Sequence, residues 1–153
     1  MADKTSSTMT IEAPRSVIMA VIADFAAYPK WATGVRAAEV LKSGPDGLAD
    51  RVRFTLDAGV IKDSYVLAYS WHGDEGVRWE LAERGAAISE MSGGYRLEHA
   101  GDATKVTYEL AVGIAIPMIG MLKRRAEKTI IDTALRGLRT RVQLIGGESG
   151  ESR

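Results

Sequence analysis

The sequence predicts an α+β fold in which a curved antiparallel sheet wraps around a long C-terminal helix. Three observations lead to this prediction: apolar residues recur at helical spacing in residues 15–25, alternate with polar residues from 35 to 114, and return to helical spacing from 117 to about 144. A period of two is typical of strands and a period of 3.6 is typical of helices. We expect one domain over residues 1–145 of the 153, followed by a disordered tail, 146–153, made of glycine, serine and charged residues.

The first element is predicted to be a strand over residues 6–12, and the second a helix over residues 15–25. Pro14 can open this helix, because the N–H that proline lacks would have no partner in the first turn. Tyr28 and Pro29 are expected to break the helix, since proline cannot continue the backbone hydrogen bonding. A second helical turn is then expected at residues 31–35.

Six strands are expected between residues 35 and 114, joined by short turns such as SGPDG, HGDEG and HAGDA. Short connections between successive strands imply an antiparallel meander. The alternation leaves one face charged and wet and the other apolar. The predicted inner face contains Val52, Phe54, Leu56, Tyr65, Leu67, Tyr69, Trp71, Val77, Trp79, Leu81, Tyr95, Leu97, Val106, Tyr108, Leu110, Val112 and Ile114.

The last helix is expected to be on the order of 40 Å long. A helix of this length needs an apolar surface to lie on, and the inner face of the sheet is the only large one that the sequence offers. We therefore expect the sheet to curl around the helix. The predicted apolar stripe of the helix contains Met118, Met121, Leu122, Ile130, Ala134, Leu138 and Val142.

Composition excludes several classes of function. Lys and Arg number 20 and Asp and Glu number 20, so the chain lacks the basic excess typical of nucleic-acid binding. The absence of cysteine excludes disulfides, thiolate nucleophiles and Cys-based metal sites. His72 and His99 lie in turn-like segments, and no metal-ligand spacing or phosphate-binding loop appears, so no metal and no cofactor are predicted. With no signal peptide and no apolar stretch approaching roughly 18 residues, we expect a cytoplasmic protein.

Two motifs give the chain a resemblance to a known superfamily. The opening segment TIEAPRSVIMAVIADFAAYPKW contains an I-x-A-P strand end and then F-x-x-Y-P-x-W, and the closing segment is PMIGMLKRRAEKTIIDTALRGLRTRV. The chain resembles the START-like, or SRPBCC, helix-grip domains, in particular the polyketide cyclase/dehydrase and lipid-transport family that includes coenzyme Q-binding START-like proteins. This resemblance covers residues 5–144 and implies a hydrophobic cavity between the sheet and the long helix.

The resemblance also implies that inner-face residues bind a small hydrophobic ligand such as a quinone, a lipid or a polyketide. Tyrosines can offer hydroxyls to a polar group while their rings contact an apolar body, and methionines adapt to ligands of variable shape. The alternative is that these side chains are ordinary core, and for Trp31 that it packs structurally at the helix exit. The predicted ligand-binding residues are Trp31, Phe54, Tyr65, Tyr69, Trp71, Trp79, Met91, Tyr95, Tyr108, Met118, Met121, Leu122 and Ile130.

The shortage of buried acid and base groups favours a non-catalytic carrier or sequestering protein. The rival hypothesis is an enzyme, a polyketide cyclase or aromatase, with Asp63 and the tyrosines as its polar groups, because Asp63 shares the parity of Tyr65. As the alternative, Asp63 is a turn residue that reaches water. A third hypothesis is a collapsed interior, with the protein acting through its surface as an interaction module.

Two surface segments suggest further roles. Lys123, Arg124, Arg125 and Lys128 form either an ordinary solvated helix face, with Glu127 and Asp132 interspersed, or a patch that contacts an anionic membrane surface transiently. Residues 42–50, which are rich in turn formers, are a candidate lid over the cavity.

Overall fold

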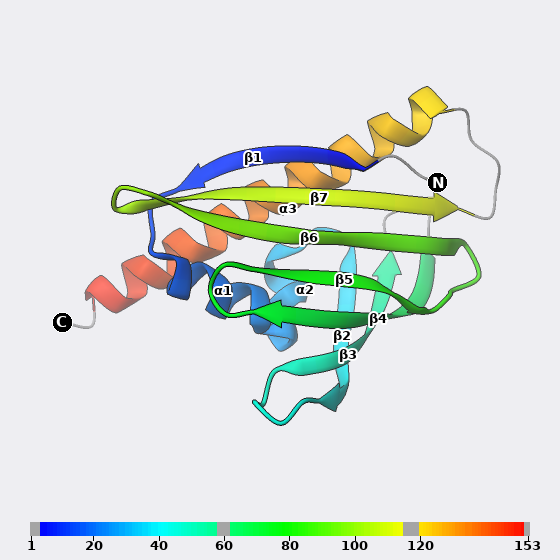
Figure 1. The fold of residues 1–153 in the computed structure, drawn as a ribbon, viewed down its shortest axis with the longest axis horizontal. Coiled ribbons are helices and arrows are strands. Elements are labelled where there is room, and N and C mark those ends of the chain that lie inside the picture. The colour runs from blue at the N-terminus through cyan, green and yellow to red at the C-terminus, as the bar shows by residue number, and fades with distance from the viewer. Residues whose placement is uncertain (1–3, 58–61, 115–119, 152–153) are drawn as a thin grey trace.

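The computed structural model describes residues 4–57, 62–114 and 120–151, and its seven strands form one antiparallel sheet (Figure 1). The six-strand meander predicted from the sequence is confirmed, and the first strand pairs with the last. The order across the sheet is β1-β7-β6-β5-β4-β3-β2. The strands are β1 (Thr5–Ile11), β2 (Val35–Ser43), β3 (Ala49–Asp57), β4 (Lys62–His72), β5 (Gly76–Glu83), β6 (Ile88–Ala100) and β7 (Ala103–Ile114).

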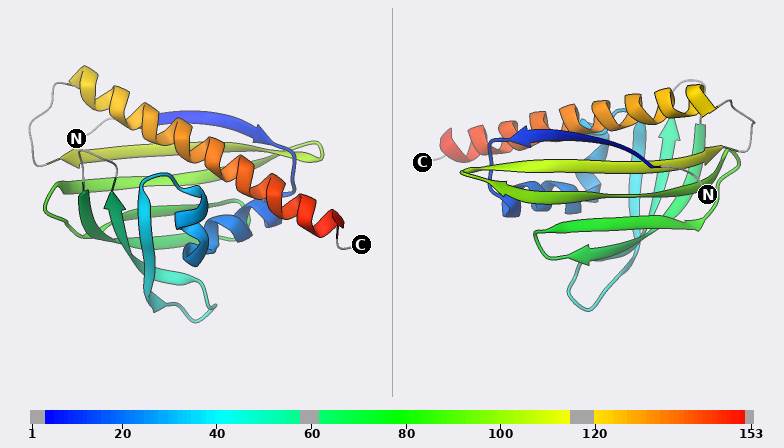
Figure 2. Two further views of the ribbon diagram at one scale, coloured as in Figure 1. Left: turned by 180° about the vertical axis from the view of Figure 1, so that it is seen from behind. Right: turned by 45° about the horizontal axis from the view of Figure 1, so that its top comes forward.

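All the helices lie on one side of this sheet. Figure 2 shows α3 (Gly120–Glu151) crossing the sheet diagonally, with α1 (Arg15–Ala23), the 3-10 helix η1 (Phe25–Ala27) and α2 (Tyr28–Trp31) beside it. This is the helix-grip fold expected from the sequence. The helical backbone of α3 continues to Glu151 and so enters the segment for which the sequence predicts disorder. The disordered tail stays a prediction.

The segment between α1 and β2 differs from the prediction. The helix ends at Ala23, and Tyr28 and Pro29 do not break it but begin the next short helix, α2. Proline is accepted in the first turn of a helix because no hydrogen bond is lost there. Phe25, Tyr28 and Trp31 consequently point into the core, where the rings of Phe25 and Tyr28 stack 4.9 Å apart.

The two faces of the sheet are as predicted along the described strands. The predicted inner-face residues are buried, except that Leu56, Trp71 and Leu81 are half-buried. Arginine and glutamate alternate with them on the outer face, where Arg78 and Arg96 both pair with Glu109. The side chain of Ile114 lies outside the described residues. The inner face is therefore the apolar surface on which α3 lies.

The apolar stripe of α3 is correct in part. Leu138 and Val142 are buried as expected, but Ile130 is 47% exposed, whereas its neighbour Ile131 is fully buried. The helix also packs closely against α2, where a Cβ added at Gly137 would lie only 2.3 Å from the carbonyl oxygen of Trp31. Met118 and the side chains of Met121 and Leu122 lie outside the described residues.

Candidate functional site

A cavity of about 330 Å³ lies between the concave face of the sheet, α2 and α3. Its walls are mostly aromatic and aliphatic, and its polar groups are tyrosine and threonine hydroxyls and one carboxylate. The interior is therefore not collapsed, contrary to the third hypothesis drawn from the sequence. The lining residues are Tyr28, Trp31, Ala32, Thr33, Val35, Phe54, Leu56, Tyr65, Leu67, Tyr69, Trp79, Ile88, Met91, Tyr95, Tyr108, Leu110, Val112, Glu127, Thr129, Ile130, Thr133 and Ala134.

Most of the residues predicted to bind a ligand meet at this cavity. Trp71 does not line it; this side chain lies farther along β4, and its indole N–H donates to the carbonyl of Ala49 at 2.7 Å. Met118 and the side chains of Met121 and Leu122 lie outside the described residues. The predicted residues that line the cavity are Trp31, Phe54, Tyr65, Tyr69, Trp79, Met91, Tyr95, Tyr108 and Ile130.

Glycines in β6 make room for the aromatic floor of the cavity. A Cβ at Gly93 would lie 2.4 Å from the carbonyl oxygen of Glu109 and 3.1 Å from the ring of Trp79. Only glycine allows both the neighbouring strand and the indole to approach this closely. The ring of Trp79 can therefore come close to β6, and it contacts Tyr95 and Tyr108, each at a centroid distance of 5.6 Å.

Four tyrosine hydroxyls on the cavity wall have no hydrogen-bond partner within the described structure. They belong to Tyr65 and Tyr69 on β4, Tyr95 on β6 and Tyr108 on β7. Burial raises the pKa of all four phenols, and neighbouring tyrosines or Asp63 raise it further. The phenols therefore stay neutral at physiological pH, as groups that can both donate and accept a hydrogen bond.

Two cavity-lining indoles also keep unpaired N–H groups. The Nε1 atoms of Trp31 and Trp79 are buried and find no acceptor among the described residues. An unpaired buried donor costs about 1–3 kcal/mol, so natural proteins keep few of them. Tyr28 shows the usual arrangement, since its hydroxyl donates to the carbonyl of Ile22. The polar atoms around the cavity are less satisfied than those of the adjoining core.

Glu127 is the cavity residue that sequence reasoning missed. The sequence pattern placed it on a solvated face of α3, but it is only 2% exposed and lines the cavity. Its Oε1 accepts a hydrogen bond from Thr5 Oγ1 and its Oε2 accepts one from the Val112 N–H, both at 2.8 Å. The spacing contained a signal, because Glu127 lies four residues before Ile131 and hence on the same side of the helix.

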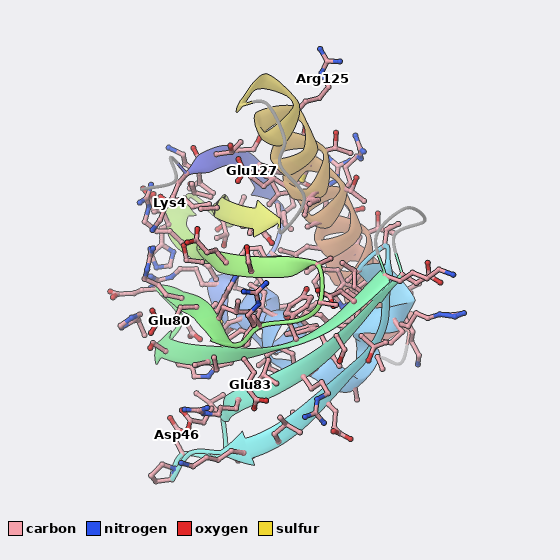
Figure 3. All side chains as sticks on the ribbon, turned by 90° about the vertical axis from the view of Figure 1, so that its right-hand side faces the viewer. Lys4, Asp46, Glu80, Glu83, Arg125 and Glu127 are labelled. Carbon is pink, nitrogen blue, oxygen red and sulfur yellow. The ribbon has the colours of Figure 1, made fainter. Side chains whose placement is uncertain are left out.

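The mouth of the cavity lies between α3 and the start of β2. Among the lining residues, Thr33, Thr129 and Ile130 are exposed, so the cavity meets solvent there. The candidate lid, residues 42–50, follows β2 to its other end, and a strand of nine residues spans about 30 Å. Figure 3 shows Asp46 in this turn, far from α3. The turn does not line the cavity, and the lid prediction is not supported.

Asp63, the catalytic candidate from the sequence, is occupied by backbone contacts. Its carboxylate accepts hydrogen bonds from the N–H groups of Ala86, Ala87 and Ile88, at 2.8, 3.1 and 2.7 Å. Burial alone would raise the pKa of Asp63, but these backbone donors lower it overall. The carboxylate does not line the cavity. Its place in the structure is that of an anchor for the loop between β5 and β6.

The basic cluster of α3 divides into residues with different surroundings. Lys128 reaches Ser7 Oγ at 2.9 Å and Asp132 at 3.2 Å, whereas Arg125 is exposed and points away from the body of the molecule (Figure 3). The side chains of Lys123 and Arg124 lie outside the described residues. Contact of this cluster with a membrane surface stays a prediction.

Comparison with known proteins identifies the family. Residues 2–143 match the family model described as "Polyketide cyclase / dehydrase and lipid transport". The chain belongs to this family. The sequence-based resemblance is thus confirmed for the polyketide cyclase/dehydrase and lipid-transport group. No curated protein matches the chain.

Several solved structures share the fold of this chain. A START superfamily protein from Mycobacterium smegmatis superposes with a TM-score of 0.86 at 19% identity, over 93% of this chain and 98% of that one. A protein from Thermus thermophilus superposes with a TM-score of 0.76 at 20% identity, over 94% of this chain and 99% of that one. An aromatase/cyclase from a Streptomyces species gives 0.72 at 14% identity, over 94% of both chains. At these identities the likeness is one of fold.

Two further findings concern the described part of the chain. No group of three or more His, Cys, Asp or Glu residues is arranged there to hold a metal ion. No helix within 4–57, 62–114 and 120–151 is both long and apolar enough to cross a membrane.

Proposed function

We propose that this protein binds a small hydrophobic ligand in the cavity and acts as a carrier or sequestering protein. The observation that carries the proposal is an unfilled apolar cavity of about 330 Å³ whose phenol groups have no partner among the described residues. Small-molecule sites in proteins are mostly apolar spaces of about 300–1,000 Å³ with a few polar groups that fix the ligand's orientation. The cavity lies at the small end of that range, which favours a compact ligand.

The energetics of this cavity favour an apolar ligand with a polar group. Each CH₂ that moves from water into an apolar site contributes about 0.8 kcal/mol. A carbonyl or hydroxyl of the ligand would also give Tyr95 or Tyr108 the hydrogen bond that each lacks. Both contributions come from groups that are already placed by the fold, so binding needs no rearrangement of the sheet.

The direct test is to identify what the protein retains when it is purified without detergent. Native mass spectrometry followed by organic extraction is expected to show one apolar molecule per chain. Thr133 and Thr140 provide matched variants, since Thr133 lines the cavity and Thr140 is an exposed residue of the same helix. Thr133→Phe should fill the cavity and abolish retention, whereas Thr140→Phe should leave it unchanged.

Tryptophan fluorescence gives an independent measurement in solution. Trp31 and Trp79 line the cavity and Trp71 does not. A bound ligand should change the emission of the Trp71→Phe variant as strongly as that of the wild type, and it should change the emission of a Trp31→Phe, Trp79→Phe double variant little. Equal retention by the two Thr→Phe variants, or a response confined to Trp71, would contradict cavity binding.

An enzyme of the polyketide cyclase or aromatase type, using the same cavity, is the second candidate. The observation that favours it is the presence of a carboxylate, Glu127, on a wall shared with tyrosine hydroxyls. A carboxylate can remove a proton next to a carbonyl, and phenols can stabilise the oxyanion that forms. Recovery of a linear poly-β-carbonyl compound in cyclised form after incubation would establish this role, and recovery unchanged would favour the carrier.

A further inference from the structure

We infer that the cavity selects uncharged ligands bearing a carbonyl or hydroxyl group and rejects anions, with Glu127 as the residue that determines this specificity. The inference rests on the proposed function, because it names the chemical class of the molecule that the cavity takes. Within the range of quinone, lipid and polyketide, it favours neutral oxygenated compounds over fatty acids and phosphate-bearing lipids.

The tyrosines provide the attractive part of the specificity. Tyr95 and Tyr108 lie on neighbouring strands with ring centroids 4.7 Å apart, and Trp79 contacts both. Their hydroxyls have no partner among the described residues. Neutral phenols can donate to a carbonyl or exchange hydrogen bonds with a hydroxyl. A ligand without oxygen would leave them unpaired.

Glu127 provides the repulsive part. Both of its carboxylate oxygens already act as acceptors, Oε1 from Thr5 Oγ1 and Oε2 from the Val112 N–H, so this side chain presents acceptor lone pairs to the cavity. No cation pairs with Glu127 within the described structure. An anionic group that enters this buried space would meet these acceptor oxygens with little screening by water.

The remaining wall offers an anion no compensation. None of the described side chains that line the cavity belongs to Lys, Arg or His. Recognition of a carboxylate or phosphate normally uses such cations or a set of backbone N–H groups. In this cavity the Val112 N–H already donates to Glu127. An anionic head group would therefore lose its hydration without gaining a charged partner.

The test compares three probes that share one ring system: naphthalene, 2-acetylnaphthalene and 2-naphthoate. The acetyl and carboxylate groups have nearly the same shape and differ in charge. Equilibrium dialysis at pH 7 against the wild type should give 2-acetylnaphthalene an affinity at least about tenfold above that of 2-naphthoate, a difference of about 1.4 kcal/mol. Naphthalene should bind with intermediate affinity, since it is neither hydrogen bonded nor repelled.

Two outcomes with the wild type are separately decisive. If naphthalene and 2-acetylnaphthalene both fail to bind, the proposed function is wrong. If both bind and 2-naphthoate binds as tightly as the ketone, the proposed function stands and the inferred specificity is wrong. Neither outcome depends on the folding of a variant.

Variants then assign the specificity to residues. Glu127→Gln keeps the size of the side chain and removes its charge, so it should raise the affinity for 2-naphthoate about tenfold and change the affinity for naphthalene little. Asp63→Asn is the matched control, because Asp63 is a hydrogen-bonded carboxylate outside the cavity. This change should leave the ratio of the affinities for 2-acetylnaphthalene and 2-naphthoate unchanged. Tyr95→Phe with Tyr108→Phe should reduce the affinity for the ketone towards that of naphthalene. An unchanged ratio in Glu127→Gln would overturn the role of Glu127.

Discussion

The space between the sheet and α3 has a packed end and a hollow end, and both are built from aromatic residues. The packed end contains Phe25 and Trp71 together with Tyr28, whose ring also borders the cavity, and the ring of Phe25 contacts both of the others. The hollow end contains the cavity-lining Tyr65, Tyr69, Trp79, Tyr95 and Tyr108. At the packed end the Tyr28 hydroxyl and the Trp71 N–H donate to backbone carbonyls, whereas at the hollow end no such bond satisfies the phenols within the described structure.

The difference shows that residue type alone does not separate structural from recognition roles. A buried tyrosine or tryptophan usually finds a hydrogen-bond partner within the protein. Where it does, as for Tyr28, the residue has completed its interactions and contributes to stability. Where it does not, as for Tyr95 and Tyr108, the polar atom stays available to a molecule that enters from outside.

The largest expected effect is the loss of stability in alkali, because all five tyrosines of the chain are buried. Burial raises the pKa of each of these phenols above 10.0 in the folded protein, with Tyr28 included. Unfolded chains release these protons above about pH 10, so stability is fully present below that pH and falls above it. At pH 11 a tyrosine whose phenol stays neutral in the folded protein loses about 1.4 kcal/mol, and the five tyrosines act in the same direction.

Tyrosinate absorbance and circular dichroism, followed together against pH, test this expectation. The phenolate signal and the loss of tertiary structure should appear in one transition, because both ends keep their phenols neutral until the chain unfolds. A separate ionisation of four phenols before unfolding would show that the hollow end is open to bulk water, and would contradict the burial on which the contrast rests.

Ile130 and Ile131 are identical neighbours on α3 with opposite surroundings. Ile131 is fully buried, so Ile131→Ala should lower the free energy of unfolding by about 2–5 kcal/mol. Ile130 lies exposed at the cavity mouth, so Ile130→Ala should change it by less than about 0.5 kcal/mol. Urea unfolding of the two variants measures the difference. Equal losses would mean that α3 is rotated from the orientation described above.

Gly137 marks the contact of α3 with α2. A Cβ there would meet the Trp31 carbonyl oxygen at 2.3 Å, so Gly137→Ala should cost about 1–3 kcal/mol of stability. Without this contact the same change would stabilise the helix by about 0.5–1 kcal/mol, because glycine is a poor helix former. The sign of the change in the free energy of unfolding, measured with urea, therefore shows whether α3 and α2 are in contact at Gly137. Thr140→Ala, an exposed position on α3, is the control and should be nearly neutral.

The fold could be predicted from the sequence because alternation and helical spacing report directly which side of an element is buried. The six strands after α2 and the inner-face tyrosines follow from that pattern. The errors arose where a residue's role depends on its neighbours in space. Pro29 suggested a break, but it fits the first turn of α2. Ile130 and Ile131 fit the pattern almost equally, and the burial of Glu127, Leu135 and Leu138 shows that the face of Ile131 is the one turned to the core.

The candidate site could be predicted in its aromatic part and not in its charged part. Tyr65, Tyr69, Tyr95 and Tyr108 share one strand parity, which places them on the same wall. Glu127 was missed because charged residues on helices are normally exposed, and its partners Thr5 and Val112 lie 122 and 15 residues away in the chain. The sequence suggests a position on the cavity side for Asp63, because its place in the alternating strand pattern matches that of Tyr65. That pattern could not show that the backbone N–H groups of residues 86–88 donate to its carboxylate oxygens.

The smallest expected effect concerns single hydroxyl groups at the two ends. Tyr28→Phe removes the bond to the Ile22 carbonyl, so it should destabilise the protein by about 0.5–1.5 kcal/mol and leave that carbonyl unpaired. Tyr95→Phe removes a hydroxyl with no partner in the described structure, so the stability of the ligand-free protein should stay within about 0.5 kcal/mol or rise slightly. Affinity for 2-acetylnaphthalene should fall in Tyr95→Phe and change less in Tyr28→Phe, because the Tyr28 ring lines the cavity but its hydroxyl already donates to the Ile22 carbonyl. Thermal unfolding and equilibrium dialysis of the same two variants measure both quantities. If Tyr95→Phe lost stability and kept its affinity, the hydroxyl would have a structural partner, and Tyr95 would belong with the packed end.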